Sequence, residues 1–248
     1  MNEWSYSLIS AGAISLISLV GILTLMISRR WLDRAIPLLI SLAVGALFGD
    51  ALVHLLPEAY KNSSSPQLTS FYVIVGIMVF FLLERFLHWH HEHHKQSIDP
   101  IHPVAYINIV SDAVHNLLDG LIIGAAYLVS VPIGIATSVA VAFHEIPQEQ
   151  GDFGIMVHAG FSPKRALCVN FLCAILALIG VVISMLIGPS VNDYTSVMIP
   201  VTAGGFIYIA GSDLIPELHH EHGVAGSVAQ FIMVVVGISV MYALLLLE

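Results

Sequence analysis

Charged residues are scarce in this sequence. Asp, Glu, Lys and Arg together make up 10% of its 248 residues, whereas hydrophobic residues make up 57%. An average soluble domain carries roughly 25% charged residues. So little charge could not cover the surface of a soluble protein of this size. The composition therefore excludes a secreted or cytosolic globular protein and indicates an integral membrane protein, with the lipid bilayer as a partner.

Positive charge and cysteine are also scarce. The chain has 8 Lys and Arg against 17 Asp and Glu, which gives a formal net charge of −9. Nucleic-acid binders need a basic face, so nucleic acid is excluded as a partner. The two cysteines, Cys168 and Cys173, share one apolar segment and are expected to be packed thiols rather than a disulfide. Histidine, in contrast, is abundant, with 13 residues.

Long apolar runs fill most of the chain. A helix that crosses the hydrocarbon core of a bilayer needs roughly 20 apolar residues. Eight segments have this character, at about 6–28, 35–57, 70–88, 104–128, 131–159, 163–187, 197–217 and 224–247. The sequence therefore predicts an all-α integral membrane protein with eight transmembrane helices, which form one transmembrane domain over residues 1–248.

Basic residues gather in the loops of one side. Only Lys61 lies on the other side. The seven basic residues that share one side are Arg29, Arg30, Arg34, Arg85, Lys95, Lys164 and Arg165. The positive-inside rule makes these loops cytoplasmic, so we expect a multi-pass protein of the cell membrane with both termini outside.

A histidine-rich run follows the third predicted span. The run HWHHEHHKQSIDP begins at His88, and the cytoplasmic loop is predicted over residues 89–103. Its histidines are either a solvated polar stretch or ligands for weak, transient metal capture, and they are His90, His91, His93 and His94.

Two neighbouring spans carry polar groups that are costly in lipid and usually functional. In the run SDAVHNLLDG, spacings of three and four place four side chains on one helical face: Asp112, His115, Asn116 and Asp119. The run HEIPQEQGD adds His144, Glu145, Gln148, Glu149 and Asp152. At 1.5 Å per residue, His115 lies about 16 Å from one face of the membrane and His144 about 20 Å from the other. Both clusters thus fall near the middle of the bilayer.

The two polar faces can converge on one site. A very short link near Ser130 makes the spans antiparallel neighbours. Imidazole nitrogen, carboxylate and amide oxygen suit Zn²⁺, Fe²⁺ or Mn²⁺, and the absence of cysteine from both faces disfavours Cu(I). A proton relay is the main alternative, and hydrogen-bonded packing is a lesser one.

A second pair of motifs indicates an inverted repeat. The segments His54-Leu-Leu-Pro-Glu58 and Asp213-Leu-Ile-Pro-Glu217 lie in spans that run in opposite directions. Inverted repeats place the binding site at the midplane where they meet. The stripes that contain these motifs are interpreted as path residues at the outer end (Asp50, His54, Glu58) and at the inner end (Asp213, Glu217, His219, His220, Glu221, His222).

With these motifs the sequence resembles the ZIP family of divalent-metal transporters. The residues that carry the resemblance are FGDALVHLLPEA, HNLLDGLIIG, HEIPQEQGDF and GGFIYIAGSDLIPEL, and the most similar subgroup reads HEXPHEXGD in its fifth helix. The resemblance implies uptake of divalent metal toward the cytoplasm and an elevator-like motion of one helix bundle against another. Zinc is the first expected ion, followed by iron, manganese or cadmium, each as transported ion and none as a cofactor.

The resemblance also implies a paired metal site between the fourth and fifth helices. One subsite would use His115, Asp119, His144 and Gln148, and the other Asn116 and Glu145, with Asn170 as a further ligand. Gln148 stands where the subgroup has histidine, which leaves the metal preference open. We also expect Glu149 to belong to the metal site. The transport path is expected to be formed by Asp50, His54, Asp112, Asp152, Asn170, Asp213 and Glu217.

Two other functions are weighed. An intramembrane zinc metalloenzyme, such as a protease or a lipid amide hydrolase, needs a metal-bound water and a fixed base. A zincin-like protease would show HExxH, but Gln148 replaces the second histidine and Pro147 interrupts the motif. A proton-coupled carrier of another solute is the third possibility. The oligomeric state is open, and a homodimer is the assembly to test.

Overall fold

The computed structural model describes residues 2–22, 29–61, 63, 65–92, 104–191, 193–218 and 223–247. Within these ranges, positions 29, 30, 32, 33, 84, 86–92, 104, 107, 213 and 247 are described by their backbone alone. The described residues form helices and short connections and contain no strand.

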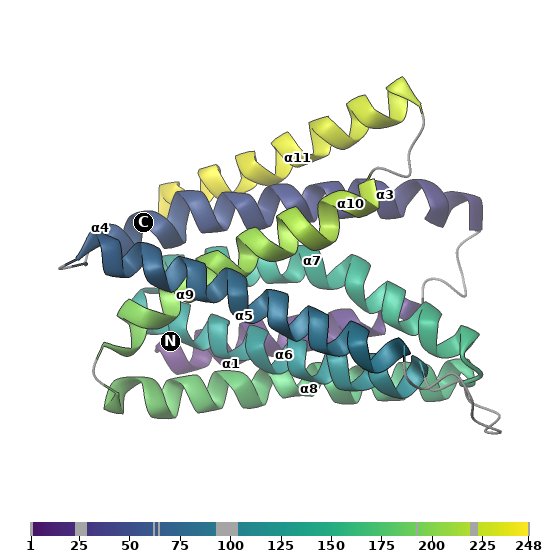
Figure 1. The fold of residues 1–248 in the computed structure, drawn as a ribbon, viewed down its shortest axis with the longest axis horizontal. Helices are drawn as coiled ribbons and strands as arrows, with labels where there is room; N and C mark the ends of the chain where they lie inside the picture. The colour runs from purple at the N-terminus through teal and green to yellow at the C-terminus, as the bar shows by residue number, and fades with distance from the viewer. Residues whose placement is uncertain are drawn as a thin grey trace.

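In the part of the chain that the structure describes, eight helical rods lie side by side along the long axis of the molecule (Figure 1). Four are single α-helices, α5 (Pro66–Glu92), α6 (Val104–Val129), α7 (Val131–His158) and α8 (Pro163–Ile187), the last of which continues into η3 (Gly188–Ser190). Two others are α1 (Glu3–Ile17) with η1 (Ser18–Val20) and α11 (Val224–Leu244) with η5 (Leu245–Leu247). The remaining two are interrupted, as α3 (Arg29–Gly49), η2 (Asp50–Leu55) and α4 (Leu56–Lys61), and as α9 (Tyr194–Tyr208), η4 (Ile209–Leu214) and α10 (Ile215–Leu218).

Most of these rods can cross a membrane. Seven of the described helices are long and apolar enough by length and composition. The eighth rod, α7, has 28 residues, about 42 Å at 1.5 Å per residue, but its polar residues lower its hydropathy. It lies between α3 and α6 and also packs against α1. The prediction of an all-α protein with several spans is confirmed.

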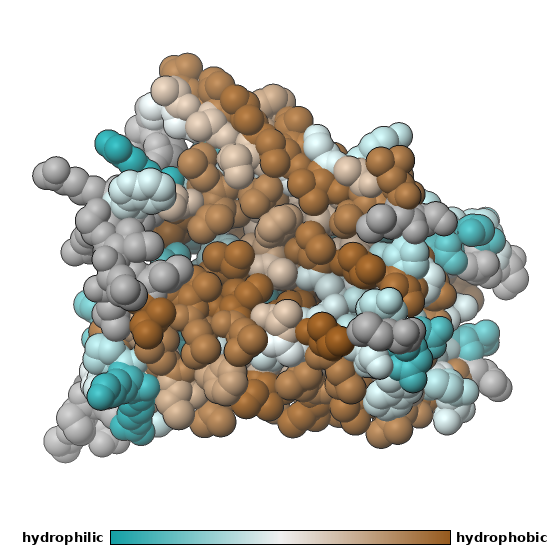
Figure 2. Space-filling model, turned by 180° about the vertical axis from the view of Figure 1, so that it is seen from behind, coloured by the Kyte–Doolittle hydropathy of each residue, from teal (hydrophilic) through white to brown (hydrophobic). Residues whose placement is uncertain are grey.

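Hydrophobic side chains cover the middle of the molecule, and hydrophilic ones gather toward the ends of its long axis (Figure 2). The exposed faces of α5 and α11 carry large apolar residues such as Phe71, Leu82, Phe231 and Tyr242. A soluble monomer rarely exposes an apolar surface that extends around the middle of the molecule. In a membrane, lipid tails would cover it.

The rods pack as two groups. α1, α6, α7 and α8 form one group, and α3, α5, α9 and α11 form the other. Glycine allows the closest approach inside the first group, because a Cβ at Gly120 of α6 would clash with the backbone oxygen of Ala177 in α8. A Cβ at Gly180 of α8 would likewise clash with the backbone oxygen of Leu117. This tight packing brings α8 directly behind the polar face of α6.

The two interrupted rods share one local feature. Each contains a π-helical segment, η2 or η4, that ends just before a proline, Pro57 or Pro216. A proline clashes with the carbonyl four residues earlier, and a wider π turn relieves such crowding. The paired motifs around His54 and Asp213 thus adopt the same backbone, as an internal repeat requires.

The predicted histidine-rich loop begins inside a helix. α5 extends to Glu92, so His90 and His91 belong to its backbone. His93, His94 and the rest of the loop through residue 103 lie outside the described residues.

Candidate metal site

The polar faces of α6 and α7 meet because the link between the two helices is a single residue. Ser130 caps the N-terminus of α7, and its hydroxyl accepts a hydrogen bond from the backbone N–H of Ile133 at 3.3 Å. Pro132 lies in the first turn, where its missing N–H costs nothing. α7 therefore returns directly along α6, as the sequence predicts.

Four side chains converge where the two faces meet. His115 and Asp119 come from α6, and His144 and Glu145 come from α7; one ligand atom of each lies within 4.8 Å of all the others. Nε2 of His115 lies 3.2 Å from Nε2 of His144 and 3.5 Å from Oε1 of Glu145. Oδ2 of Asp119 lies 3.7 Å from Nε2 of His115 and 3.3 Å from Nε2 of His144. We call these four residues the His-carboxylate cluster.

The spacing of the cluster matches the coordination shell of zinc. Two atoms bound at about 2.0–2.1 Å to a tetrahedral Zn²⁺ lie about 3.3 Å apart. A tetrahedron has six edges, and five of them are known here: the four distances above and 3.7 Å between Nε2 of His144 and Oε1 of Glu145. They span 3.2–3.7 Å. A small divalent ion could therefore bind all four atoms without a large rearrangement.

Burial makes the cluster costly without a cation. The side chains of Asp119, His144 and Glu145 are each 1% exposed, and His115 is 18% exposed. Both Asp119 carboxylate oxygens and Oε1 of Glu145 have no hydrogen-bond partner. Two buried carboxylates in this state carry a large desolvation penalty, which a bound divalent cation would offset.

The His144 ring is oriented for metal binding. Its Nδ1 lies 3.3 Å from the carbonyl oxygen of Ala140, a contact in which Nδ1–H donates. The lone pair of Nε2 then points into the cluster, which is the usual arrangement of a metal-bound histidine. Phe206 of α9 packs edge-on against the ring, with 6.2 Å between the centroids. Ala140 and Phe206 were not predicted from sequence, since small and aromatic residues in an apolar helix indicate ordinary packing.

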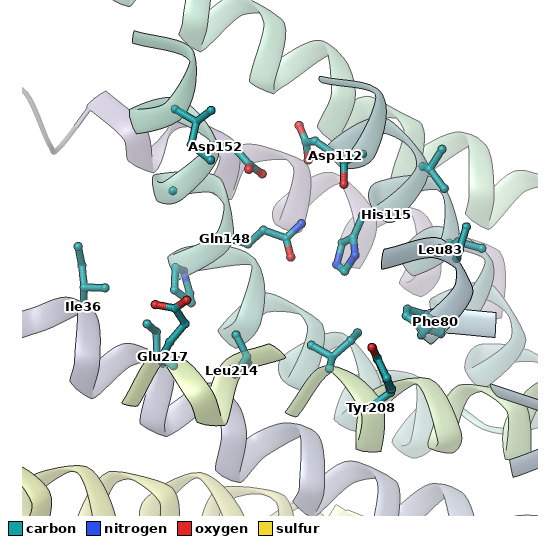
Figure 3. A pocket seen from close by; sticks show the side chains of 18 residues that line it. Ile36, Phe80, Leu83, Asp112, His115, Gln148, Asp152, Tyr208, Leu214 and Glu217 are labelled. Atoms are coloured by element: carbon teal, nitrogen blue, oxygen red, sulfur yellow. The ribbon is translucent and has the colours of Figure 1, made fainter. Parts of the chain in front are cut away.

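A cavity of about 510 Å³ reaches the cluster from one side. Its walls come from α3, α5, α6, α7 and the rod of α9 to α10, and His115 is the cluster residue that lines it. In Figure 3, Gln148 and Asp152 extend from α7 toward His115 and Asp112 on α6, while Glu217 lies farther along the wall. A cation in the cavity would thus meet Gln148 and His115 before the buried carboxylates.

Other predicted site residues lie next to the cluster. Asn116 donates from Nδ2 to Oδ1 of Asp112 at 2.7 Å. Asn170 of α8 donates from Nδ2 to the backbone oxygen of Glu149 at 3.0 Å. Glu149 is buried and does not line the cavity, although its neighbour Gln148 does. The predicted residues therefore fall into two groups. Gln148 and Asp152 lie in the cavity wall, whereas Glu149 and Asn170 are buried at the contact with α8.

The predicted outer path residues are packed rather than exposed to the cavity. Asp50 accepts a hydrogen bond from the hydroxyl of Thr137 at 3.0 Å, and His54 contacts the carbonyl of Met241 through Nε2 at 2.8 Å. Both are buried, and neither lines the cavity. At the other end, Glu217 does line it. The side chain of Asp213 and residues 219–222 lie outside the described part of the chain.

Comparisons with known proteins give one consistent result. A family model described as "ZIP Zinc transporter" matches residues 2–103 and 89–245. Similar proteins include "Zinc transporter zipt-7.1" of Caenorhabditis briggsae, 31% identical over 85% of this chain, and "Zinc transporter ZIP10" of Homo sapiens, 38% identical over 64%. "Zinc transporter ZIP13" of Pongo abelii is 34% identical over 82%. The matched regions span 71%, 21% and 65% of these three relatives, in that order.

Proposed function

Because the chain belongs to the ZIP zinc transporter family, we propose that it carries divalent metal cations across a membrane, with zinc as the main substrate. The family consists of transporters, so the alternative of an intramembrane metalloenzyme is set aside. The substrate ion binds the His-carboxylate cluster during transport and is not a resident cofactor.

The tetrahedral spacing of the cluster is the observation that carries this proposal. Two imidazoles and two carboxylates would bind Zn²⁺ with no net charge left in the buried site. Neutrality matters here because an uncompensated charge at membrane depth is costly. Iron, manganese and cadmium are further substrates, since Gln148 offers the site a neutral amide oxygen where a third imidazole would favour zinc.

The position of the cavity supports transport toward the cytoplasm. The cavity is lined by Ile36, Leu83 and Ile155, which lie near the end of the bundle that carries Arg34, Arg85, Lys164 and Arg165. The positive-inside rule assigns that end to the cytoplasm. The two chain termini lie together at the opposite end (Figure 1), which would then face outside the cell membrane. We therefore propose that this conformation, with its cavity open toward the basic end of the bundle, is the one that releases metal inward.

Packed side chains separate the cluster from the end where the termini lie. Phe206 packs against the His144 ring, and Leu55 and Tyr127 are fully buried in the same hydrophobic core. Thr137 of the first helix group donates a hydrogen bond to Asp50 of the second. A metal ion from outside needs these contacts to open. We propose that the two helix groups shift against each other between outward and inward states, with α7 and α6 moving against α3 and α9.

Uptake by proteoliposomes tests the function. We expect ⁶⁵Zn²⁺ uptake by vesicles that contain the full chain, and a loss of at least 90% of the rate for His144→Ala. Asp193→Asn is the matched control, because Asp193 is exposed and its backbone φ of 59° suits asparagine. Wild-type vesicles that take up no more zinc than empty ones would contradict the proposal. The homodimer stays a prediction, which light scattering of the detergent-solubilised protein can check.

A further inference from the structure

Glycines mark the places where the helices of this protein come closest to one another. Glycine is unfavourable inside a helix relative to alanine, so close packing explains its use there. At six helical positions a Cβ would clash with a backbone oxygen of a neighbouring helix: Gly45, Gly76, Gly120, Gly180, Gly204 and Gly237. A glycine in the middle of a helix therefore usually indicates a helix–helix contact in this chain.

Gly151 of α7 lacks such a contact. A Cβ at this position would meet no atom within 4 Å, and Gly151 is exposed and lines the cavity. Gly154 on the same helix is equally open but does not line the cavity. Alanine at position 151 would fit this conformation and would favour the helix. A helix contact that explains glycine at position 151 would have to form in another conformation.

The register of α3 and α7 identifies the opposite side of that contact. The two helices run antiparallel (Figure 1), and the hydroxyl of Thr137 on α7 donates to Oδ2 of Asp50, directly after α3, at 3.0 Å. Gly151 follows Thr137 by fourteen residues, and Ile36 precedes Asp50 by fourteen. Fourteen residues make nearly four helical turns, about 21 Å. Gly151 and Ile36 are thus matched positions, each four turns from the bonded pair.

The cavity lies between these two positions. Ile36 and Ile40, one turn apart on α3, both line it, as does Gly151. In Figure 3, Ile36 stands apart from the turns of α7 that carry Gln148 and Asp152. The two helices are therefore in contact at the bonded pair and separated at the cavity. A slide of α7 by one turn, about 5.4 Å, would still bring Gly151 opposite one of the two isoleucines.

We propose that Gly151 is the point at which α7 closes against α3 in the outward states of the transport cycle, so that Ile36 and Ile40 seal the cavity. Alternating access needs such a seal, because a cluster open to both sides at once would let the ion leak. A residue without a Cβ lets the isoleucine side chains approach the backbone of α7 and exclude water. The inference rests on the proposed transport function and adds to it the contact that ends access from the cytoplasmic side.

Zinc uptake by proteoliposomes with the full-length chain tests the contact. Gly151→Ala should lower the maximal uptake rate at least about fivefold, and Gly151→Leu should lower it further, because the added carbons keep α7 away from α3. In detergent, Gly151→Ala should have an equal or higher Tm and a Kd for Zn²⁺ within about threefold of the wild type, since this conformation has room for the methyl group. Gly154→Ala is the matched control and should transport within about twofold of the wild type.

A disulfide detects the closed contact directly. In a chain with Cys168→Ser and Cys173→Ala, Gly151→Cys is combined with either Ile36→Cys or Ile40→Cys. The two Cα atoms of a disulfide lie about 4.4–6.8 Å apart, so the bond requires α7 to approach α3 across the cavity. Treatment of membranes with diamide should cross-link at least one of the two pairs, as measured by mass spectrometry of the free thiols.

A pair that should not meet gives the control for cross-linking. Gly12→Cys on α1, combined with Ile36→Cys, should stay reduced. Any of three results would overturn the inference: wild-type uptake by Gly151→Ala, an equal loss of uptake in Gly154→Ala, and no disulfide in either pair that contains Gly151→Cys. A lower Tm for Gly151→Ala would do the same, because the glycine would then be required for folding.

Failure of the proposed function would look different. A wild type that takes up no zinc would contradict transport, whereas the approach of α7 to α3 is measured by the disulfide without any uptake. The two failures are therefore distinguishable.

Discussion

At the scale of single residues, the His-carboxylate cluster concentrates the chemistry. Asp119 contributes a carboxylate that is buried, lacks a hydrogen-bond partner and lies 3.3 Å from Nε2 of His144. Asp119→Asn keeps its shape and removes its charge. Breaking a buried charge pair costs about 3–5 kcal/mol. We therefore expect the Kd for Zn²⁺ to rise at least about a hundredfold, measured by competition with a chelating dye in detergent. An unchanged Kd would remove Asp119 from the site.

Replacement of Gln148 tests whether this residue of the cavity wall determines which ion is bound. Its side chain extends toward His115 (Figure 3), and an amide oxygen is a weaker zinc ligand than imidazole. Gln148→His should tighten zinc binding roughly tenfold, about 1.4 kcal/mol. A carrier must also release its ion, so the variant should show a lower KM for Zn²⁺ with an equal or lower maximal rate. Uptake kinetics for Zn²⁺ and Mn²⁺ measure this. If neither the zinc KM nor the metal ranking changes, Gln148 does not contact the metal.

The sequence could predict the cluster but not the division of its neighbours. Spacings of three and four place His115 and Asp119 on one face, and the short link at Ser130 fixes the facing helix. Gln148 and Glu149 follow one another in the chain, yet one lines the cavity and the other is buried against α8. That division depends on how α7 is rotated relative to a third helix. Local spacing carries no information about this rotation.

At the scale of the helices, close packing of α6 on α8 supports the polar face of α6. A Cβ at Gly120 would meet the backbone of Ala177, which can move only if the helices separate. Overpacking of this kind typically costs about 1–3 kcal/mol. Gly120→Ala should therefore lower the Tm in detergent by several degrees. Gly12→Ala is the matched control, because a Cβ at Gly12 of α1 meets no atom within 4 Å. Its Tm should stay equal or rise, since alanine favours helix over glycine. Equal losses in both variants would contradict the role of this contact.

Apolar runs located the rods well, but they did not reveal the internal breaks. The spans predicted at about 35–57 and 197–217 coincide with rods that contain η2 and η4. Pro57 and Pro216 gave a local signal for these segments, because each disrupts the turn that precedes it. The span predicted at 131–159 coincides with α7 (Val131–His158), although the polar residues of its second half lower its hydropathy. Packing against several neighbouring helices explains how this polar half is accommodated.

At the scale of the whole molecule, the unequal distribution of basic residues predicts which end faces the cytoplasm. Ile155 lines the cavity and is 40% exposed, whereas Asp193 lies in an exposed turn at the end where the two termini lie. With Cys168 changed to serine and Cys173 to alanine, a single cysteine at either position can be labelled by a membrane-impermeant thiol reagent. We expect Ile155→Cys to react only from the cytoplasmic side and Asp193→Cys only from outside.

Zinc adds a second, conformational readout to the same experiment. If the two helix groups shift against each other during transport, outward states bury the cavity wall, and the rate at which Ile155→Cys is labelled reports the fraction of inward states. A transported ion must bind both the inward and the outward state. Saturating zinc should therefore change the labelling rate of Ile155→Cys by an amount set by the ratio of its affinities for the two states. Asp119→Asn, which lacks a cluster ligand, should show a smaller response at the same zinc concentration. Labelling of both cysteines from one side would disprove the orientation. If Ile155→Cys responds to zinc identically with and without Asp119→Asn, zinc binding at the His-carboxylate cluster does not control the motion.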